Sequence, residues 1–333
     1  MGFKELRDKV FKSFNFNTSF SLKYSSDGLK VYEGGKNTYV LDSDEAREIA
    51  CYPFVVGERF ESLNLSAAKK FVSFLDREGK LSDKIIMQHV LRASLGYKVH
   101  EALREKGVNF VESWYRPLYR YVSFRMHTVR ELVMTYEEPK QLPQGEYVVF
   151  KPDTEATGNT SLFVLENLLK KCSNSGCKIK KVLFYGFISE ESVKKLTSFL
   201  ESYNISSEFY ALENVTPLAS NGYDMPLYGL DEPLYRSEGK KVKLAASAPE
   251  EVVERMLPCY FPGMDQPGDW SERQVKLFDG YSWKEVDLKV HAKRSLEVLN
   301  SLREISKSED WYDEAHEEIY NKISSELTKI LSL

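Results

Sequence analysis

Two carboxylates followed by a run of hydroxyl-bearing residues stand out in residues 146–161, EYVVFKPDTEATGNTS. Asp153 and Glu155 can accept hydrogen bonds from the hydroxyl groups of a sugar. Gly158 allows a tight turn and a close approach of the backbone to a ligand. The neighbouring residues offer hydroxyls and backbone N–H groups suited to a phosphate: Thr154, Ala156, Thr157, Asn159, Thr160 and Ser161. The stretch therefore has the chemistry of a sugar-phosphate site.

The elements on either side of this loop place it where a ligand is expected. The apolar run 147–150 predicts a strand buried on both faces of a parallel sheet. Residues 162–171 predict a helix, whose first turn adds unpaired N–H groups and the positive end of the helix dipole. Open α/β sheets bind ligands at the carboxyl ends of their strands, which is the position of this loop. The loop lacks the lysine of a Walker motif and the three glycines of a dinucleotide fingerprint.

A second strand and turn carry an arginine that suits a pyrophosphate. Residues 84–91 are apolar apart from Gln88 and His89, and they predict a central strand. Arg92 follows at its carboxyl end, where a guanidinium can hold a pyrophosphate through two hydrogen bonds. A helix over 96–106 and a strand over 108–115 complete a βαβ unit.

Three segments, in this order, resemble type I phosphoribosyltransferases. The string PDTEATGNT resembles the loop of that family that binds 5-phosphoribosyl 1-pyrophosphate (PRPP), and it is most similar to the loop of uracil phosphoribosyltransferase. Upstream, LRASLG at 91–96 is similar to the pyrophosphate loop. Downstream, SNGYDMPLYGLDEPLY at 220–235 is similar to the segment that holds the uracil ring.

The resemblance implies an enzyme that transfers ribose 5-phosphate from PRPP to a nucleobase, preferably a pyrimidine such as uracil, and releases pyrophosphate. Mg²⁺ would arrive with PRPP, without a site made by protein side chains alone. Arg92, Asp153 and Glu155 would be catalytic, and Arg116 would be a second contact to PRPP. By the same resemblance, the base-binding residues are Asp224, Gly229 and Asp231.

Two departures from the family pattern keep a second function open. Pro152 occupies the position of the first of two adjacent acids, which shifts the ribose contact to Asp153. The uracil segment carries an extra residue before Asp231. A non-catalytic protein of the same fold, which binds PRPP or a nucleotide as a sensor or regulator, is therefore the alternative to an enzyme.

An aromatic and basic segment at 114–136 allows a third hypothesis. Its arginines, Arg120, Arg125 and Arg130 among them, alternate with tyrosines, a combination that suits single-stranded nucleic acid. In the phosphoribosyltransferases this position carries a flexible hairpin that closes over pyrophosphate. We prefer the hairpin, and we expect no nucleic-acid partner.

Composition agrees with an ordinary globular protein. The 333 residues carry a net charge of -4, which gives no overall attraction to nucleic acid or anionic membrane. No apolar run reaches the ~18 residues that span a bilayer, and the first residues lack a signal-peptide core, so we expect a cytoplasmic protein. The four cysteines are expected to be reduced thiols, and their spacing is a poor zinc signal.

The whole pattern predicts an α/β fold with a doubly wound, mostly parallel sheet. We divide the chain into an N-terminal helix and hairpin extension at 1–60, a phosphoribosyltransferase-like core at 61–238 and a C-terminal helical extension at 239–333. Residues 258–269 are expected to be a Pro/Gly-rich linker. Two long amphipathic helices then follow, and their apolar stripes must be covered by the core or by a second subunit. A homodimer is the expected assembly.

Overall fold

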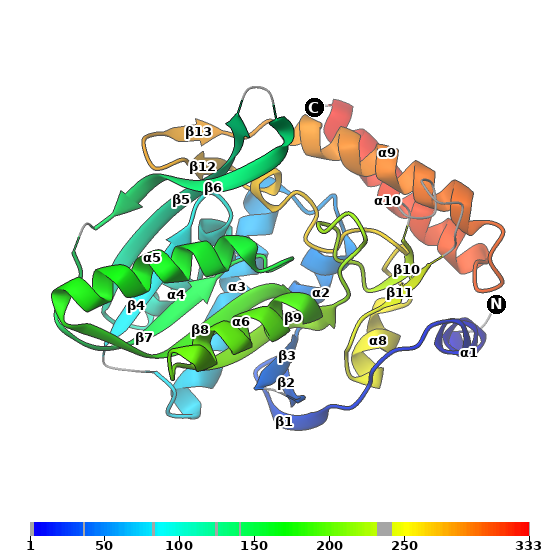
Figure 1. The fold of residues 1–333 in the computed structure, drawn as a ribbon. Helices are drawn as coiled ribbons and strands as arrows, with labels where there is room; N and C mark the ends of the chain where they lie inside the picture. Colours follow the sequence, from blue (N-terminus) through cyan, green and yellow to red (C-terminus); the bar gives the residue numbers. More distant parts are fainter. Residues whose placement is uncertain are drawn as a thin grey trace.

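A nine-stranded sheet forms the centre of the computed structural model. The structure describes residues 3–35, 37–81, 84–123, 126–139, 141–231 and 242–332. For residues 122–123 and 126–130 it describes the backbone alone. The order of the strands in the sheet is β1-β2-β3-β9-β8-β7-β4-β5-β6 (Figure 1). These strands are β1 (Ser21–Ser26), β2 (Leu29–Glu33), β3 (Thr38–Asp42), β4 (Ile85–Val90), β5 (Phe110–Ser123), β6 (Met126–Glu138), β7 (Gly145–Pro152), β8 (Cys177–Ser189) and β9 (Ser206–Thr216).

The six consecutive strands from β3 to β5 in this order are all parallel. Antiparallel pairs are confined to the two edges, where β1 and β2 continue the sheet beyond β3 and β6 pairs with β5. The predicted mostly parallel sheet is confirmed. Because β3 pairs directly with β9, the N-terminal hairpin continues the sheet of the core.

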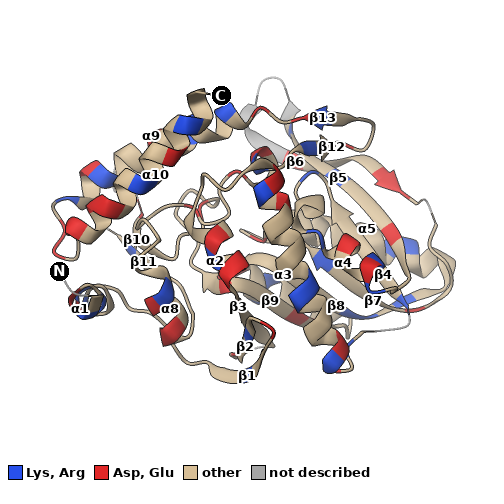
Figure 2. Ribbon diagram, turned by 180° about the vertical axis from the view of Figure 1, so that it is seen from behind, with Lys and Arg blue, Asp and Glu red and all other residues tan. Residues whose placement is uncertain are grey.

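Helices cover both faces of the sheet, as a doubly wound fold requires. In Figure 1, α5 and α6 lie in front of the sheet, and α2, α3 and α4 lie behind it. Figure 2 shows the second group from the other side. The described helices are α1 (Phe3–Ser13), α2 (Asp44–Cys51), α3 (Gly57–Arg77), α4 (Val99–Glu105), α5 (Asn159–Ser175), α6 (Glu190–Ser202), α8 (Glu250–Met256), α9 (Leu288–Ser306) and α10 (Glu314–Ser332), with the 3₁₀ turns η1 (Ser94–Tyr97) and η2 (Trp270–Arg273).

The helix predicted over 96–106 is divided in the structure. Residues 94–97 form the 3₁₀ turn η1, Lys98 adopts a left-handed conformation with φ 57°, and α4 begins only at Val99. A left-handed residue cannot continue a right-handed helix, so the chain changes direction at Lys98. Gly96 thus lies in the turn after Arg92 and does not begin a helix.

The C-terminal helices α9 and α10 are covered within the chain. They pack on each other at one end of the molecule (Figure 1), and the side chains of Leu299, Leu302, Ile319, Ile323 and Leu327 are buried. The apolar stripes on these helices therefore need no second subunit to cover them.

Two small two-stranded sheets complete the fold: β10 (Tyr228–Leu230) with β11 (Lys243–Ala245), and β12 (Lys276–Phe278) with β13 (Trp283–Glu285). In the described part of the chain, no helix is both long and apolar enough to cross a bilayer.

Candidate functional site

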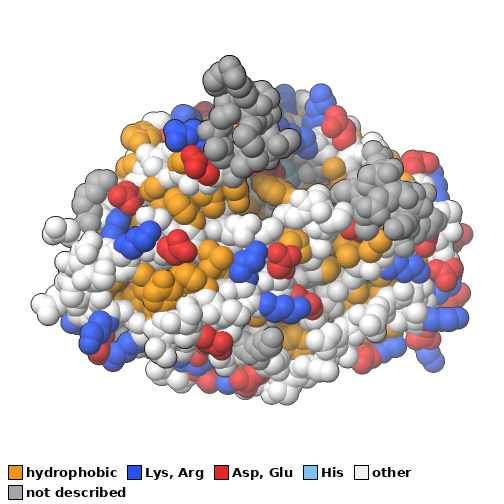
Figure 3. All heavy atoms as spheres, viewed as in Figure 1, with side chains coloured by type: hydrophobic (Ala, Val, Ile, Leu, Met, Phe, Trp, Pro, Cys, Tyr) orange, Lys and Arg blue, Asp and Glu red, His pale blue; other side chains and the backbone are white. Residues whose placement is uncertain are grey.

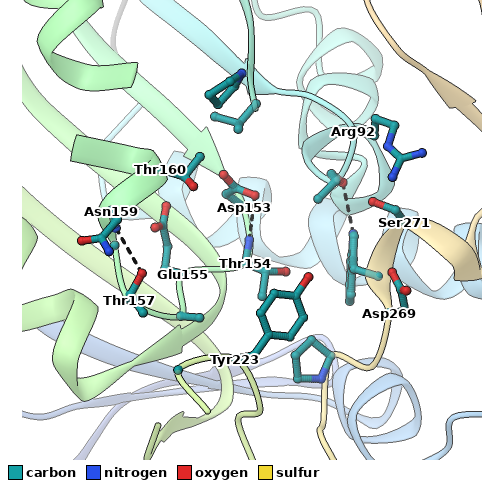
Figure 4. Close-up of a pocket in the computed structure, with 18 of the residues that line it drawn as sticks. Arg92, Asp153, Thr154, Glu155, Thr157, Asn159, Thr160, Tyr223, Asp269 and Ser271 are labelled. Atoms are coloured by element: carbon teal, nitrogen blue, oxygen red, sulfur yellow. Dashed lines mark hydrogen bonds between the residues drawn. The ribbon is translucent and has the colours of Figure 1, made fainter. Parts of the chain in front are cut away.

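The predicted ribose and pyrophosphate loops open into one cavity. Strands β4 and β7 are parallel neighbours in register, with Ile85 opposite Val148 and Met87 opposite Phe150. The loops that leave their carboxyl ends are therefore side by side. Both line a cavity of about 530 Å³, to which Arg92 contributes from one loop and Asp153 from the other (Figure 4). The structure thus brings together the two side chains on which the sequence interpretation depends.

The loop after β7 and the start of α5 form one wall. Thr157, Gly158, Asn159 and Thr160 line the cavity. Gly158 has φ 73°, and a Cβ at this position would lie 3.4 Å from the Cα of Ser192 in α6. The first turn of α5 leaves N–H donors without intrahelical acceptors, which suits an anion.

A lysine on α6 holds this loop from outside. Lys195 Nζ donates to the carbonyl oxygen of Thr157 at 2.7 Å and to Oδ1 of Asn159 at 3.0 Å. Its charge lies close to the turn without lining the cavity, so it supports the conformation of the phosphate loop.

A buried lysine, which the sequence analysis did not single out, organises the acids at the end of β7. Lys151 Nζ lies 3.0 Å from Asp153 Oδ2 and 2.8 Å from Glu155 Oε1. Ser161 donates its hydroxyl to Glu155 at 2.6–2.7 Å. Residues 151, 153 and 155 alternate, and side chains at that spacing share a face of an extended chain. That spacing, with a lysine at the end of an apolar strand, was the signal in the sequence.

Both acids have partners within the protein, since Asp153 contacts Lys151 and also accepts the N–H of Thr154 at 2.9 Å. Glu155 lines the cavity, but its carboxylate is only 3% exposed and is engaged by Lys151 and Ser161. Its carboxylate oxygens already accept hydrogen bonds from Lys151 and Ser161, so Glu155 is less available than an unpaired acid to bind ribose. Burial raises the pKa of Asp153 to about 6, against the opposing effect of Lys151. Burial lowers the pKa of Lys151, but the two carboxylates outweigh this effect and raise it overall.

Arg116 does not line the main cavity. Its Nη1 donates to the carbonyl oxygen of Asp279 at 2.7 Å and lies 3.5 Å from the carboxylate of the same residue. It faces a smaller adjacent cavity of about 220 Å³, which Arg92 also lines. The β5–β6 hairpin reaches the main cavity through Pro117, Leu118 and Tyr119 instead.

The three residues predicted to read the base lie outside the cavity lining. Both backbone groups of Asp224 are used locally, because its N–H donates to Asn221 Oδ1 and its carbonyl accepts from Ala219. A Cβ on Gly229 would lie 2.2 Å from the backbone nitrogen of Gly263, so Gly229 serves close packing. Asp231 is buried and accepts the N–H of Ser220 at 3.0 Å.

Other residues of the same segment do reach the cavity. Asn221, Gly222 and Tyr223 line it, and Figure 4 shows the ring of Tyr223 pointing toward Thr154. Tyr223 is 71% exposed, which leaves its aromatic face open to a ligand.

The opposite wall comes from the segment that was expected to be a linker. Asp265, Pro267, Gly268, Asp269, Trp270 and Ser271 line the cavity. Trp270 Nε1 donates to the carbonyl of Ala93 at 3.1 Å, and its ring stacks on Tyr97 with centroids 4.0 Å apart. Tyr97 in turn shares a 2.5 Å hydrogen bond with Thr154. The C-terminal part of the chain is therefore built into the site: it contacts the loop after β4 directly and the loop after β7 through Tyr97.

The sequence contained a signal for this wall. Two aspartates stand among the prolines and glycines of PGMDQPGD, residues 262–269. Rigid turns that carry polar groups can present them to a ligand at little entropic cost.

The cavity is more acidic than basic. Within the described ranges, Arg92 is the one Lys or Arg in its lining, whereas Asp153, Glu155, Asp265 and Asp269 are acids. In those same ranges, no group of three or more His, Cys, Asp or Glu side chains is arranged to hold a metal ion. To an anionic ligand the described lining offers one guanidinium and the N–H groups at the start of α5.

The surface gives little support to nucleic-acid binding. Figure 3 shows acidic and basic side chains interspersed on one face of the molecule, and in the ribbon of Figure 2 the acidic and basic residues are likewise mixed along the described elements. Arg120 lies 3.7 Å from Glu131 on the adjacent strand. Arg125 and the side chain of Arg130 lie outside the described residues.

Comparisons with known proteins give structural similarities of limited extent. No protein-family model and no curated protein sequence matches the chain. The adenine phosphoribosyl transferase of Trypanosoma brucei is similar with a TM-score of 0.36 and 14% identity, over 59% of this chain and 91% of that one. A purine phosphoribosyltransferase from Pyrococcus horikoshii has a TM-score of 0.29 and 16% identity, over 44% and 80%. A protein from Aquifex aeolicus has a TM-score of 0.37 and 16% identity, over 54% and 84%.

Two of these three proteins carry the name of the enzyme class that the sequence resembles, and both are named for purine bases. The activity proposed below for this chain rests on its own residues.

Proposed function

We propose that this protein is a phosphoribosyltransferase, which transfers ribose 5-phosphate from PRPP to a nucleobase and releases pyrophosphate. One observation carries the proposal: Arg92, Asp153 and the first turn of α5 line the same cavity at the carboxyl ends of adjacent parallel strands. A guanidinium, a carboxylate and a set of free N–H donors are the groups that pyrophosphate, ribose hydroxyls and a 5′-phosphate require.

Each wall has a role in this proposal. Thr157, Gly158, Asn159 and Thr160 bind the 5′-phosphate, and Asp153 accepts hydrogen bonds from the ribose hydroxyls. Arg92 holds the pyrophosphate and stabilises its charge as the bond to C1′ breaks. The hairpin residues 117–119 close over the reactants and keep water from PRPP. Arg116 can join them only after its contacts with Asp279 are released.

The acidic character of the cavity fits a substrate that carries Mg²⁺. Mg²⁺ that arrives with PRPP would neutralise charge on the leaving pyrophosphate. Asp153 and Asp269 line different walls of the cavity and would hold such a cation through water (Figure 4).

We place the acceptor base between Tyr223 and Asp265. The exposed ring of Tyr223 offers a stacking surface. Burial raises the pKa of Asp265 well above its usual range, which favours a neutral carboxyl group. Its Oδ1 accepts the N–H of Met225 at 2.9 Å, so the other oxygen is the one that can form a hydrogen bond with a polar group on the edge of a base, such as an N–H or a C=O. Uracil carries both groups and is also the base that the sequence resemblance suggests, so it is the first base to test.

The proposal is tested by pyrophosphate release from PRPP and Mg²⁺ with a panel of pyrimidine and purine bases. We expect base-dependent release in the wild type. Arg92→Ala should weaken PRPP binding by about tenfold to a hundredfold, since a hydrogen bond to a charged group contributes roughly 1.5–3 kcal/mol. Arg120→Ala, an exposed arginine on the hairpin, is the matched control and should leave binding unchanged.

A PRPP-binding sensor is the second candidate, and the engagement of Glu155 favours it. Pro152 occupies the first acidic position, and Lys151 contacts both Asp153 and Glu155, so each carboxylate at this strand end already has a partner within the protein. A protein that binds PRPP through Arg92 and Asp153, but releases no pyrophosphate with any base, would be this sensor. Loss of both binding and release would contradict both functions.

Assembly as a homodimer stays a prediction. Sedimentation or light scattering of the whole chain would decide it, with and without PRPP. A monomer in both conditions would contradict it.

A further inference from the structure

All four cysteines of the chain lie in two close pairs. The sulfurs of Cys172 and Cys177 are 2.8 Å apart, and those of Cys51 and Cys259 are 3.2 Å apart. Non-bonded carbon atoms pack best at about 3.5–4.0 Å, and sulfur is larger than carbon. We propose that each pair is a disulfide site, with the connectivity Cys172–Cys177 and Cys51–Cys259.

The first pair joins a helix to the strand that follows it. Cys172 lies in the last turns of α5, Gly176 ends the helix in a left-handed conformation with φ 69°, and Cys177 is the first residue of β8. Both cysteines are buried. A bond here fastens the carboxyl end of the helix whose other end lines the cavity.

The second pair joins segments 208 residues apart. Cys51 ends α2 behind the sheet, and Cys259 lies in the turn after α8. Asp265, at the start of the C-terminal cavity wall, follows Cys259 by six residues. A cross-link that closes a long loop restricts the unfolded chain more than a short one does. This bond would therefore anchor the C-terminal segment to the core.

The two thiols of the long-range pair are suited to different steps of oxidation. Cys259 is partly exposed and Cys51 is buried. A hydrogen bond with Cys51 lowers the pKa of Cys259, whereas burial raises the pKa of Cys51. Cys259 is thus the nucleophile and Cys51 the resolving thiol.

The oxidant is a low-molecular-weight disulfide. The Cys259 thiolate attacks one of its sulfurs, the sulfur–sulfur bond of the oxidant breaks, and one small thiol leaves. Cys51 then attacks the Cys259 sulfur of the mixed disulfide and releases the second small thiol. The protein loses two electrons and two protons, which the two released thiols carry away. The protein sulfurs need to approach by only about 1 Å to reach bonding distance. The Cys172–Cys177 bond forms by the same two exchange steps between the close sulfurs of that pair.

Thiol labelling of the whole chain tests the connectivity. The protein is exposed to oxidised glutathione, unfolded in denaturant and treated with an alkylating reagent. We expect no labelled cysteine in this sample and four after prior reduction, and we expect non-reducing peptide maps to show Cys51 joined to Cys259 and Cys172 joined to Cys177. Four labelled thiols in the oxidised sample, or crossed pairs, would overturn the proposal.

A serine variant tests the anchoring role of the long-range bond. Cys259→Ser should leave one labelled thiol, Cys51, and keep the Cys172–Cys177 bond. Oxidation should raise the melting temperature of the wild type by several degrees and that of Cys259→Ser by less. Hydrogen exchange at 265–271 should be slower in the oxidised wild type than in the oxidised variant. Equal melting shifts and equal exchange in the two proteins would overturn the anchoring role. None of these measurements depends on phosphoribosyltransferase activity.

Discussion

The ammonium group of Lys151 lies 3.0 Å from a carboxylate oxygen of Asp153, and both side chains are buried at the end of β7. The lysine lies behind the cavity, and the acid opens into it. Removing one partner from a buried ion pair leaves an uncompensated charge. The same ion pair therefore affects both the stability of the end of β7 and the charge of Asp153 in the cavity.

Lys151→Met should destabilise the fold strongly. Without the lysine, Asp153 and Glu155 face each other as buried acids, and breaking such a pair costs about 3–5 kcal/mol. Chemical denaturation at pH 7 measures the loss. Lys180→Met is the matched control, because that lysine forms an exposed ion pair with Glu146 on the surface of β8, where about 0–1 kcal/mol is expected.

A double variant guards against simple failure to fold. Lys151→Met with Glu155→Gln removes one of the two stranded charges and should recover part of the stability. Wild-type stability in Lys151→Met alone would show that the lysine does not balance these acids.

The raised pKa of Asp153 predicts a pH-dependent stability. With a pKa of about 6 in place of 3.8, the folded chain keeps a proton that the unfolded chain loses between about pH 4 and pH 6. The contribution of Asp153 to the free energy of unfolding therefore falls as pH rises through this window, by up to about 1.4 kcal/mol per pH unit. Asp153→Asn lacks this titration, so its stability relative to the wild type should rise over the same range.

The same titration should appear in ligand binding with the opposite sense. Ionised Asp153 accepts hydrogen bonds from ribose hydroxyls, so PRPP affinity of the wild type should increase from pH 5 to pH 7 more than that of Asp153→Asn. Titration calorimetry of both proteins separates this effect from the titration of PRPP itself. Parallel pH profiles would contradict a ribose contact by Asp153.

Comparing alanine variants of two glycines distinguishes the effect of backbone strain on stability from the effect of the loop on phosphate binding. Gly158→Ala and Gly107→Ala both place a side chain on a left-handed residue, with φ 73° and 77°, and both should lose about 1–2 kcal/mol of stability. A Cβ at Gly107 has no heavy atom within 4 Å, and this glycine lies outside the cavity lining. Only Gly158→Ala should also weaken PRPP binding, measured by calorimetry. Equal affinity in the two variants would remove the loop from the proposed phosphate site.

The elements that could be predicted from the sequence are those whose structure is determined by the local residue pattern and by the order of segments along the chain. The apolar strands, the turn at Gly158 and the paired loops after β4 and β7 follow from short segments whose residue types agree with their structure. Arg92 and Asp153 line one cavity, and both follow the carboxyl ends of adjacent parallel strands.

What the sequence did not show depends on long-range packing. Trp270 and Ala93 are 177 residues apart in the sequence, and no hydrophobic periodicity predicts a contact between them. Lys98 breaks a helical pattern that continues through it, while ion pairs with Glu61 and Glu101 fix its side chain. The residues expected from the resemblance to bind the base lie outside the cavity lining, because Asp224 and Asp231 form hydrogen bonds within their own segment.

The C-terminal wall should contribute to PRPP binding through one hydrogen bond. Trp270→Phe keeps an aromatic ring beside Tyr97 but removes the Nε1 donor to Ala93, next to Arg92. The Ala93 carbonyl still accepts the N–H of Gly96, so the variant loses one hydrogen bond, worth about 0.5–1.5 kcal/mol, and the loop that carries Arg92 loses a fixed point. We expect PRPP affinity to fall several-fold. Trp311→Phe is the control, because Trp311 is equally buried and its Nε1 has no hydrogen-bond partner in the described part of the chain. Equal PRPP affinities in the two variants would mean that the C-terminal segment encloses the cavity without positioning Arg92.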